Sequence, residues 1–149
     1  MVYYFAYGSL MDVLFVRDLG VHFKNPCSGQ LNGFELNVNV KDSTNPNLGY
    51  ANIVPDKKQK VEGVLFEITE EDLILLDSYE GYPELYSRKQ INIFSLKTKT
   101  YFKAWVYIGN MNFVVNRNLK LGKFQRDRIK NGFKFLSIEY QRKLTKFIY

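Results

Sequence analysis

Glu80, in the segment Leu76–Pro83 (LDSYEGYP), has the surroundings of a proton-transfer group. It is expected at or just past a helix C-terminus, among aromatic neighbours. The negative helix end and desolvation by Tyr79, Tyr82 or other rings both disfavour a charged carboxyl and raise its pKa toward the range useful for acid/base chemistry. The alternative is an exposed turn glutamate, which is common at helix ends.

A second candidate is the turn Tyr7-Gly8-Ser9-Leu10, which lies between an expected strand and an expected helix. Successive backbone N–H groups at such a turn can point outward and hold a carboxylate or a phosphate. Glycine permits close approach of a ligand, but Gly and Ser are also common in such turns for conformational reasons alone. The turn by itself leaves both interpretations open.

Other possible nucleophiles lack partners. Ser9 would need a base, and the single histidine, His22, is 13 positions away without a triad spacing. The single cysteine, Cys27, has the same shortage and cannot form a disulfide within the chain, so it is expected to be a small buried or surface thiol. One histidine and one cysteine leave almost nothing for a zinc site, so we predict no metal and no cofactor and expect His22 to be structural.

Hydrophobic periodicity indicates the strands that must position these residues. A β-branched and aromatic run, then alternation and turn-bounded apolar runs, predict strands at 2–6, 33–40, 49–54, 61–68, 86–95 and 100–108. Turn formers at 42–47 and at 55–60 separate the second, third and fourth of these strands. This pattern predicts a meander.

Helices are expected at three places. A short helix over 11–19 follows the first turn, and a second begins at Thr69 as N-cap and ends near Glu80. Asp77 and Glu84, near its end, are expected to be solvated or capping groups. The basic C-terminal third is expected to be helical in places, with one apolar face behind Ser137 that packs on the sheet: Tyr140, Leu144, Phe147 and Ile148.

Length and composition predict one domain over residues 1–149. Apolar residues make up 46% and charged residues 24%, which is typical of a globular protein. No apolar run approaches the roughly 20 residues of a membrane span, and the N-terminus lacks the pattern of a secretory signal. We therefore expect no membrane partner and a cytoplasmic location.

The net charge of +6 could attract either nucleic acid or an anionic small molecule. A basic stretch in the C-terminal third could touch phosphates, but the interleaved apolar residues equally suit a solvated helix face, which is the interpretation we prefer. The stretch contains Lys120, Lys123, Arg126, Arg128 and Lys130. Nucleic acid is therefore the last-ranked partner.

Two segments together resemble the γ-glutamylcyclotransferase family, in its AIG2-like and γ-glutamylamine cyclotransferase-like form. They are YFAYGSLM (4–11) and LLDSYEGYPELYSR (75–88), and the similarity extends to LGYANIVP (48–55), VEGVLFEIT (61–69) and NGFKFLSIEYQRKL (131–144). The resemblance implies an α+β fold, a small mixed β-barrel with flanking helices. It agrees with the elements expected above.

The resemblance also implies site roles by position. Tyr7, Gly8, Ser9 and Leu10 match the loop whose backbone holds the glutamyl moiety, and Glu80 matches the catalytic acid/base. Tyr86 and Tyr107 resemble cleft tyrosines of the family, which implies that they bind the substrate.

Leu10 departs from the dipeptide-acting branch of the family, which commonly has Asn there, while amine-acting relatives have Y-G-T-L. The segment around Glu80 resembles the amine-acting branch and the tail resembles the dipeptide-acting branch. The leaving group therefore stays open between an amine and an amino acid.

The function implied is release of 5-oxoproline from a small γ-glutamyl compound, by attack of the substrate's own α-amine on its γ-carbonyl. The principal alternative is a non-catalytic small-molecule-binding domain of the same fold, because a fold does not determine a function. A nucleic-acid-binding protein is the third hypothesis. A monomer or a homodimer is expected.

Overall fold

Two long strands dominate the fold of residues 1–148, which are the residues that the computed structural model describes. They contain 18 and 21 residues, where strands usually have five or six. The elements in chain order are β1 Val2–Ala6, η1 Ser9–Met11, α1 Val13–Asp18, β2 Lys24–Lys41, β3 Leu48–Ile68, α2 Glu70–Glu80, β4 Tyr86–Ser95, β5 Tyr101–Gly109, η2 Met111–Phe113, β6 Lys120–Leu121, α3 Lys123–Asn131, η3 Phe133–Phe135 and α4 Ile138–Ile148.

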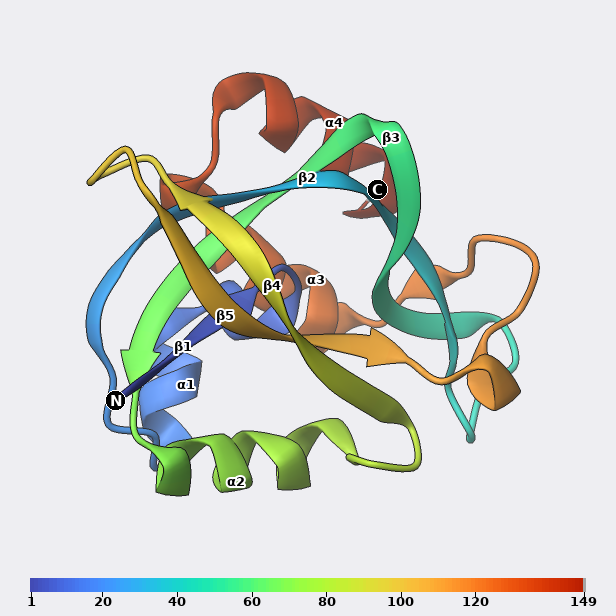
Figure 1. The fold of residues 1–149 in the computed structure, drawn as a ribbon. Coiled ribbons are helices and arrows are strands. Elements are labelled where there is room, and N and C mark those ends of the chain that lie inside the picture. The colour runs from blue at the N-terminus through green and yellow to red at the C-terminus, as the bar shows by residue number, and fades with distance from the viewer. Residues whose placement is uncertain (149) are drawn as a thin grey trace.

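Five strands close into a barrel in the order β1-β5-β4-β2-β3, and β3 pairs back to β1. The β1–β5 pair is parallel, the other barrel pairs are antiparallel, and short β6 extends β3 outside the ring. Helices flank this barrel (Figure 1). The expected α+β fold, a small mixed barrel with flanking helices, is confirmed.

The strand predictions are correct except in the middle of the chain. β2 and β3 form one long hairpin instead of a three-stranded meander, and β2 begins at Lys24 instead of 33. Residues 56–59 leave the ladder opposite Gly33, between the register pairs Phe34–Pro55 and Asn32–Lys60. The expected connection at 55–60 is therefore a bulge inside one strand, because β2 pairs with β3 on both sides of it.

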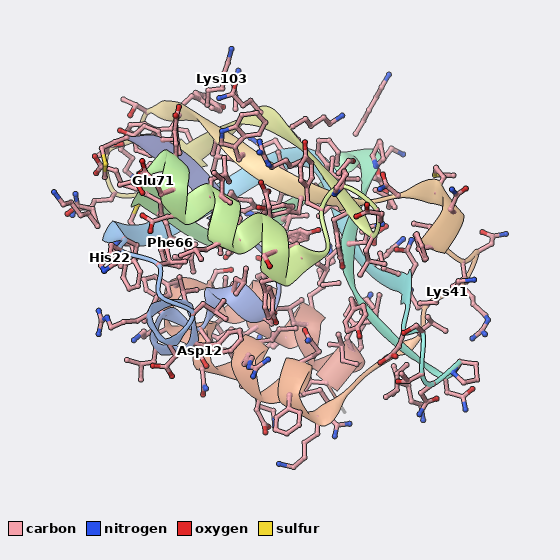
Figure 2. All side chains as sticks on the ribbon, turned by 90° about the horizontal axis from the view of Figure 1, so that it is seen from below. Asp12, His22, Lys41, Phe66, Glu71 and Lys103 are labelled. Carbon is pink, nitrogen blue, oxygen red and sulfur yellow. The ribbon has the colours of Figure 1, made fainter. Side chains whose placement is uncertain are left out.

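The helix expected to begin at Thr69 and end near Glu80 is α2, and it lies on the opposite side of the barrel from α4 (Figure 1). Its N-terminus carries a full capping box, in which the Thr69 hydroxyl accepts the backbone N–H of Asp72 and the Asp72 carboxylate accepts the backbone N–H of Thr69. Seen from below, α2 crosses the barrel strands with α1 beside it, and Glu71 lies on this near side (Figure 2).

Asp12 ties the short helix α1 to α3. Its carboxylate accepts the backbone N–H of Phe15 as an N-cap and the side-chain amide of Asn131, at 3.2 and 2.8 Å. Figure 2 shows Asp12 where these two helices meet. The contact places α3 beside the chain segment that follows the first turn.

The C-terminal helix α4 agrees with the expectation from sequence. The Ser137 hydroxyl accepts the backbone N–H of Tyr140, and the expected apolar face is buried or half-buried against the core. Within residues 1–148 no helix combines the length and apolar character that crossing a membrane requires. In the same stretch no three His, Cys, Asp or Glu side chains come together in a way that could hold a metal ion.

Candidate active site

A cavity of about 300 Å³ lies between the first turn, α2 and the barrel strands. We call it the central cavity. Fourteen residues line it: Tyr4, Phe5, Tyr7, Gly8, Ser9, Leu10, Tyr50, Ala51, Tyr79, Glu80, Leu85, Tyr86, Tyr107 and Gln125. All seven site residues expected from the sequence are in this set, although they come from segments that are up to 100 positions apart.

Glu80 reaches the cavity because of its place on α2. Leu73, Leu76, Asp77 and Glu80 follow the i, i+3, i+4, i+7 spacing that puts side chains on one helix face. The two leucines are buried in the core, so the same face turns Glu80 inward at the last residue of the helix. Gly81 then ends α2 in the left-handed conformation, with φ of +67°, which glycine adopts without strain.

Burial raises the pKa of the Glu80 carboxyl from 4.5 to about 8. The residue keeps some accessible surface because it faces the cavity, but the surrounding protein displaces most of the water that would solvate a charge. No described residue donates a hydrogen bond to this carboxyl. Desolvation alone therefore favours the neutral acid in the free protein.

The rings that surround Glu80 are not all those expected. Tyr79 lines the cavity, but Tyr82 is exposed and lies over the guanidinium of Arg88. Burial is the cause given above for the raised pKa, and a contribution from the negative end of α2 stays a prediction. The charge of Glu80 in turn helps burial to raise the pKa of four buried tyrosines, Tyr4, Tyr7, Tyr86 and Tyr107.

The first turn forms the wall of the cavity at the end of β1. Ser9 and Leu10 begin the 3-10 turn η1, so their N–H groups precede the first intrahelical acceptor and have none within it. A Cβ on Gly8 would come within 3.1 Å of Ala51 Cβ, tighter than ordinary packing, so β3 passes close behind the turn. The Leu10 side chain is only 2% exposed and packs into the core.

Hydroxyl groups hold the turn and the neighbouring walls in place. Tyr7 donates to the backbone carbonyl of Tyr107 at 2.6 Å, and Tyr86 donates to the carbonyl of Ala51 at 2.7 Å. The Ser9 and Tyr79 hydroxyls are 3.2 Å apart and share a hydrogen bond. The hydroxyls of Tyr7 and Tyr86 thus donate to backbone carbonyls of the protein, and the two residues shape the cavity mainly through their rings.

Asp77 is not the solvated or capping group expected from the sequence. Its carboxylate accepts the Tyr107 hydroxyl at 2.7 Å and two hydrogen bonds from the guanidinium of Arg88, at 2.7 and 3.0 Å. A pair this well buried needs both partners, which explains why a charged residue occupies the inner face of α2.

Comparison with known proteins identifies the family. A family model described as "Gamma-glutamyl cyclotransferase, AIG2-like" matches residues 4–126, from β1 into α3. The chain belongs to this cyclotransferase family. The match includes the first turn, all of α2 and every residue that lines the central cavity.

Individual relatives agree with that membership. A curated protein of Methanocaldococcus jannaschii named "Putative gamma-glutamylcyclotransferase" is 33% identical over 63 residues, and the alignment covers 39% of this chain and about half, 52%, of that protein. A solved "Gamma-glutamyl cyclotransferase" superposes with a TM-score of 0.80 at 22% identity, covering 98% of this chain and 87% of the other. YkqA from Bacillus subtilis gives 0.85 at 24% identity, covering 99% and 54%.

Sequence reasoning missed part of the cavity of this cyclotransferase-family chain. Tyr4, Tyr50 and Gln125 line it without having been singled out. Tyr4 lies inside the first motif, so its place next to the turn was a usable signal. No sequence signal pointed to Gln125, because it lies on α3 within a basic stretch. Only the packing of α3 near the first turn brings it to the cavity.

The other candidates lie away from the central cavity of the family fold. The His22 side chain is 92% exposed, 3.8 Å from Asp72, and does not line the cavity where Ser9 would need a base. Cys27 is half-buried and lines a separate cavity of about 280 Å³. The basic stretch is only partly a solvated face, because Arg128 is half-buried with its guanidinium carbon 3.6 Å from the centroid of Phe15.

Proposed function

We propose that this chain is a γ-glutamyl cyclotransferase that releases 5-oxoproline from a γ-glutamyl amino acid or γ-glutamylamine, with Glu80 as general acid/base. The observation that carries the proposal is a carboxyl with a pKa of about 8 that faces the same cavity as the main chain of the first turn. A group with this pKa can both accept and donate a proton near neutral pH. Family membership supports the same reaction.

The substrate supplies its own nucleophile. Its α-amino nitrogen forms a bond to the γ-carbonyl carbon while the carbonyl π electrons move to oxygen, and the carbonyl then reforms as the bond to the leaving nitrogen breaks. Two protons leave the α-ammonium nitrogen and two reach the leaving nitrogen, relayed one at a time by Glu80. The products are 5-oxoproline and an amine or amino acid in its ammonium form.

The cavity favours this reaction by holding a curled substrate. A five-membered ring closes only when the α-nitrogen lies near the γ-carbon, and positioning of this kind can supply a large part of the rate. In the proposal, the N–H groups of Ser9 and Leu10 bind oxygens of the glutamyl moiety and stabilise the developing oxyanion. The departure from Asn at Leu10 leaves this role intact, because the main chain performs it and the side chain packs inward.

Electrostatics favour a glutamyl ligand in one orientation. Among the cavity-lining residues described above, Glu80 is the one carboxyl, and none of the others is Asp, Lys, Arg or His. A substrate ammonium placed beside it forms an ion pair in a poorly solvated site and lowers the pKa of Glu80 on binding. Binding thus converts the neutral acid into the carboxylate that begins the reaction.

Replacing Glu80 by Gln tests the role of the carboxyl. The amide keeps the size but cannot relay protons, so we expect the rate of 5-oxoproline formation to fall about a hundredfold or more. The substrates are a panel of γ-glutamyl amino acids, γ-glutamylamines and glutathione, assayed by mass spectrometry for both products.

The matched control is Glu84→Gln, which removes an exposed carboxyl from the neighbouring loop that does not line the cavity. It should keep wild-type turnover. Near-normal turnover by folded Glu80→Gln protein would refute the assigned role. Binding of a γ-glutamyl compound by the wild type without product formation would favour the non-catalytic alternative.

A further inference from the structure

An ion pair joins α2 to β4 close to the central cavity. Arg88 on β4 makes a bidentate contact with Asp77 on α2, with donor–acceptor distances of 2.7 and 3.0 Å. Both side chains are largely buried, with 16% and 13% exposure. Paired hydrogen bonds between a guanidinium and a carboxylate restrict direction as well as distance, so the contact sets the orientation of α2 on the barrel.

The guanidinium itself has little freedom to move. It lies over the rings of Tyr82 and Trp105, at 4.6 and 4.4 Å from their centroids. Arg88 is also directly opposite Tyr107 in the β4–β5 register, which puts both side chains on the same face of the sheet. The cation is therefore held by rings on one side and by Asp77 on another.

Tyr107 extends the contact to the first turn. Its hydroxyl donates to the Asp77 carboxylate at 2.7 Å, and its backbone carbonyl accepts the Tyr7 hydroxyl at 2.6 Å. A continuous path of hydrogen bonds thus runs from Arg88 through Asp77 and Tyr107 to Tyr7. It joins the last turn of α2 to the turn that faces Glu80.

We propose that Asp77, Arg88 and Tyr107 form a positioning network that sets the Glu80 carboxyl relative to the first turn. The inference rests on the proposed function, because it assigns Glu80 the acid/base role. Asp77 precedes Glu80 by three residues on the same face of α2, and the Glu80 carboxyl accepts no hydrogen bond from a described residue. Its position therefore depends on the last turn of α2, which Asp77 ties to Arg88 on β4 and Tyr107 on β5.

The network also balances charge near Glu80. Asp77 and Arg88 neutralise each other, whereas the other titratable groups near the carboxyl are tyrosines: Tyr4, Tyr7, Tyr50, Tyr79, Tyr86 and Tyr107. Removing Arg88 leaves an unpaired carboxylate near Glu80 and raises its pKa, while removing Asp77 leaves an unpaired cation and lowers it. A purely structural role of Asp77 and Arg88 would not shift the Glu80 pKa in opposite directions in the two variants.

The test compares Asp77→Asn, Arg88→Gln, Arg88→Lys and Tyr107→Phe with the control Asp127→Asn, which removes an exposed ion pair on α3. We expect kcat to fall about 10- to 100-fold in the first two variants with KM changed less than about threefold, because small misplacements are costly. Arg88→Lys keeps the charge without the planar fork and should be intermediate. Tyr107→Phe removes only the hydroxyl that donates to Asp77, so it tests the network in a variant whose barrel should still fold.

The acidic limb of the pH profile should move to higher pH in Arg88→Gln and to lower pH in Asp77→Asn. The same opposite shifts are expected in a carbon-13 NMR titration of the Glu80 carboxyl, which needs no turnover. Unchanged kcat and unchanged Glu80 titration in folded variants would overturn the proposal, as would shifts in the same direction. If the wild type releases no 5-oxoproline but the NMR shifts appear, the proposed function fails and the positioning network stands.

Discussion

At the scale of single residues, Glu80 combines two properties that rarely occur together. Its carboxyl lies in a cavity lined by aromatic rings, and no described residue donates a hydrogen bond to it. An isolated buried charge is costly, so the group takes up a proton instead. In the proposed function, a substrate ammonium that enters the cavity converts this acid into the carboxylate.

The first prediction at this scale concerns the pH dependence of catalysis. Since kcat/KM reports the free enzyme, its acidic limb should rise about tenfold per pH unit and bend near pH 8, where Glu80 loses its proton. Steady-state rates between pH 5.5 and 9.5 with a γ-glutamyl substrate measure this. A bend near pH 4.5, the ordinary value for glutamate, would mean that Glu80 is solvated.

The second prediction concerns stability. The folded pKa of Glu80 is above its unfolded value, so its contribution is fully present below about pH 4.5 and is lost as the pH rises through about 8. Glu80→Gln avoids that loss. Its advantage over the wild type should grow by about 1–4 kcal/mol between pH 5 and 9, less than the full 1.4 kcal/mol per pKa unit because the cavity admits water.

Urea unfolding at pH 5, 7 and 9 measures this difference, with Glu84→Gln as the control that should show no pH-dependent gain. Equal free energies of unfolding for Glu80→Gln and wild type at all three pH values would contradict the desolvation of Glu80.

At the scale of elements, α2 shows why a helix with a functional end has a weak apolar stripe. Leu73 and Leu76 face the core while Ile74 and Leu75 are exposed, and the inner face continues with Asp77 and Glu80. The apolar pattern alone does not tell the inner face from the outer one. The helix is instead defined by its Thr69 capping box and its Gly81 C-cap.

The contact between β1 and β3 sets the position of the first turn and carries a further prediction. A Cβ on Gly63 would lie 2.1 Å from the carbonyl oxygen of Ala6, which is backbone and cannot rotate away. Gly63→Ala should therefore push the end of β1 aside, destabilise the fold by about 1–3 kcal/mol and reduce turnover.

Thermal and urea unfolding test this, with Gly122→Ala as the control, because a Cβ there meets only Leu48 at an ordinary 3.7 Å. The control should change stability by only about a few tenths of a kcal/mol, because the weaker N-cap of Ala is offset by the lower conformational entropy of the unfolded chain. Equal stability of the two variants would show that β1 tolerates displacement at Ala6.

At the scale of the whole molecule, the buried carboxylate of Glu62 attaches the C-terminal helix to the barrel. Glu62 lies on β3 and is 4% exposed, and its two oxygens accept the backbone N–H and the hydroxyl of Ser137 at 2.8 and 2.7 Å. Lys60 lies 3.9 Å away. An acid at this helix N-terminus is also favoured by the helix dipole.

Glu62→Gln should cost about 1.5–3 kcal/mol of unfolding free energy, because an amide offers one acceptor where two donors point. Hydrogen exchange should show faster opening of α4 than of β2 and β3. The exposed Glu139→Gln on the same helix serves as the control and should be close to neutral. Unchanged exchange in α4 would contradict the role of Glu62.

Local sequence determined much of this protein. The strand at 2–6 follows from a β-branched and aromatic run, and those at 86–95 and 100–108 follow from apolar runs separated by a turn. The helix α2 follows from Thr69 and Gly81, because caps act over a few residues. The two motifs also contain six of the seven expected site residues that line the central cavity, and Tyr107 is the one that lies outside them. These are all properties of short segments.

Tertiary structure alone decided how those segments meet. The continuity of β3 through 56–59 depends on β2 lying beside it, and the approach of Gln125 depends on α3 packing near the first turn. No sequence pattern singled out Glu62 or Arg88, and Asp77 was expected to be a solvated or capping group, because the partners of all three are distant in the sequence. Burial also raised the pKa of Glu80 to about 8, because desolvation depends on neighbours that are distant in sequence and close in space.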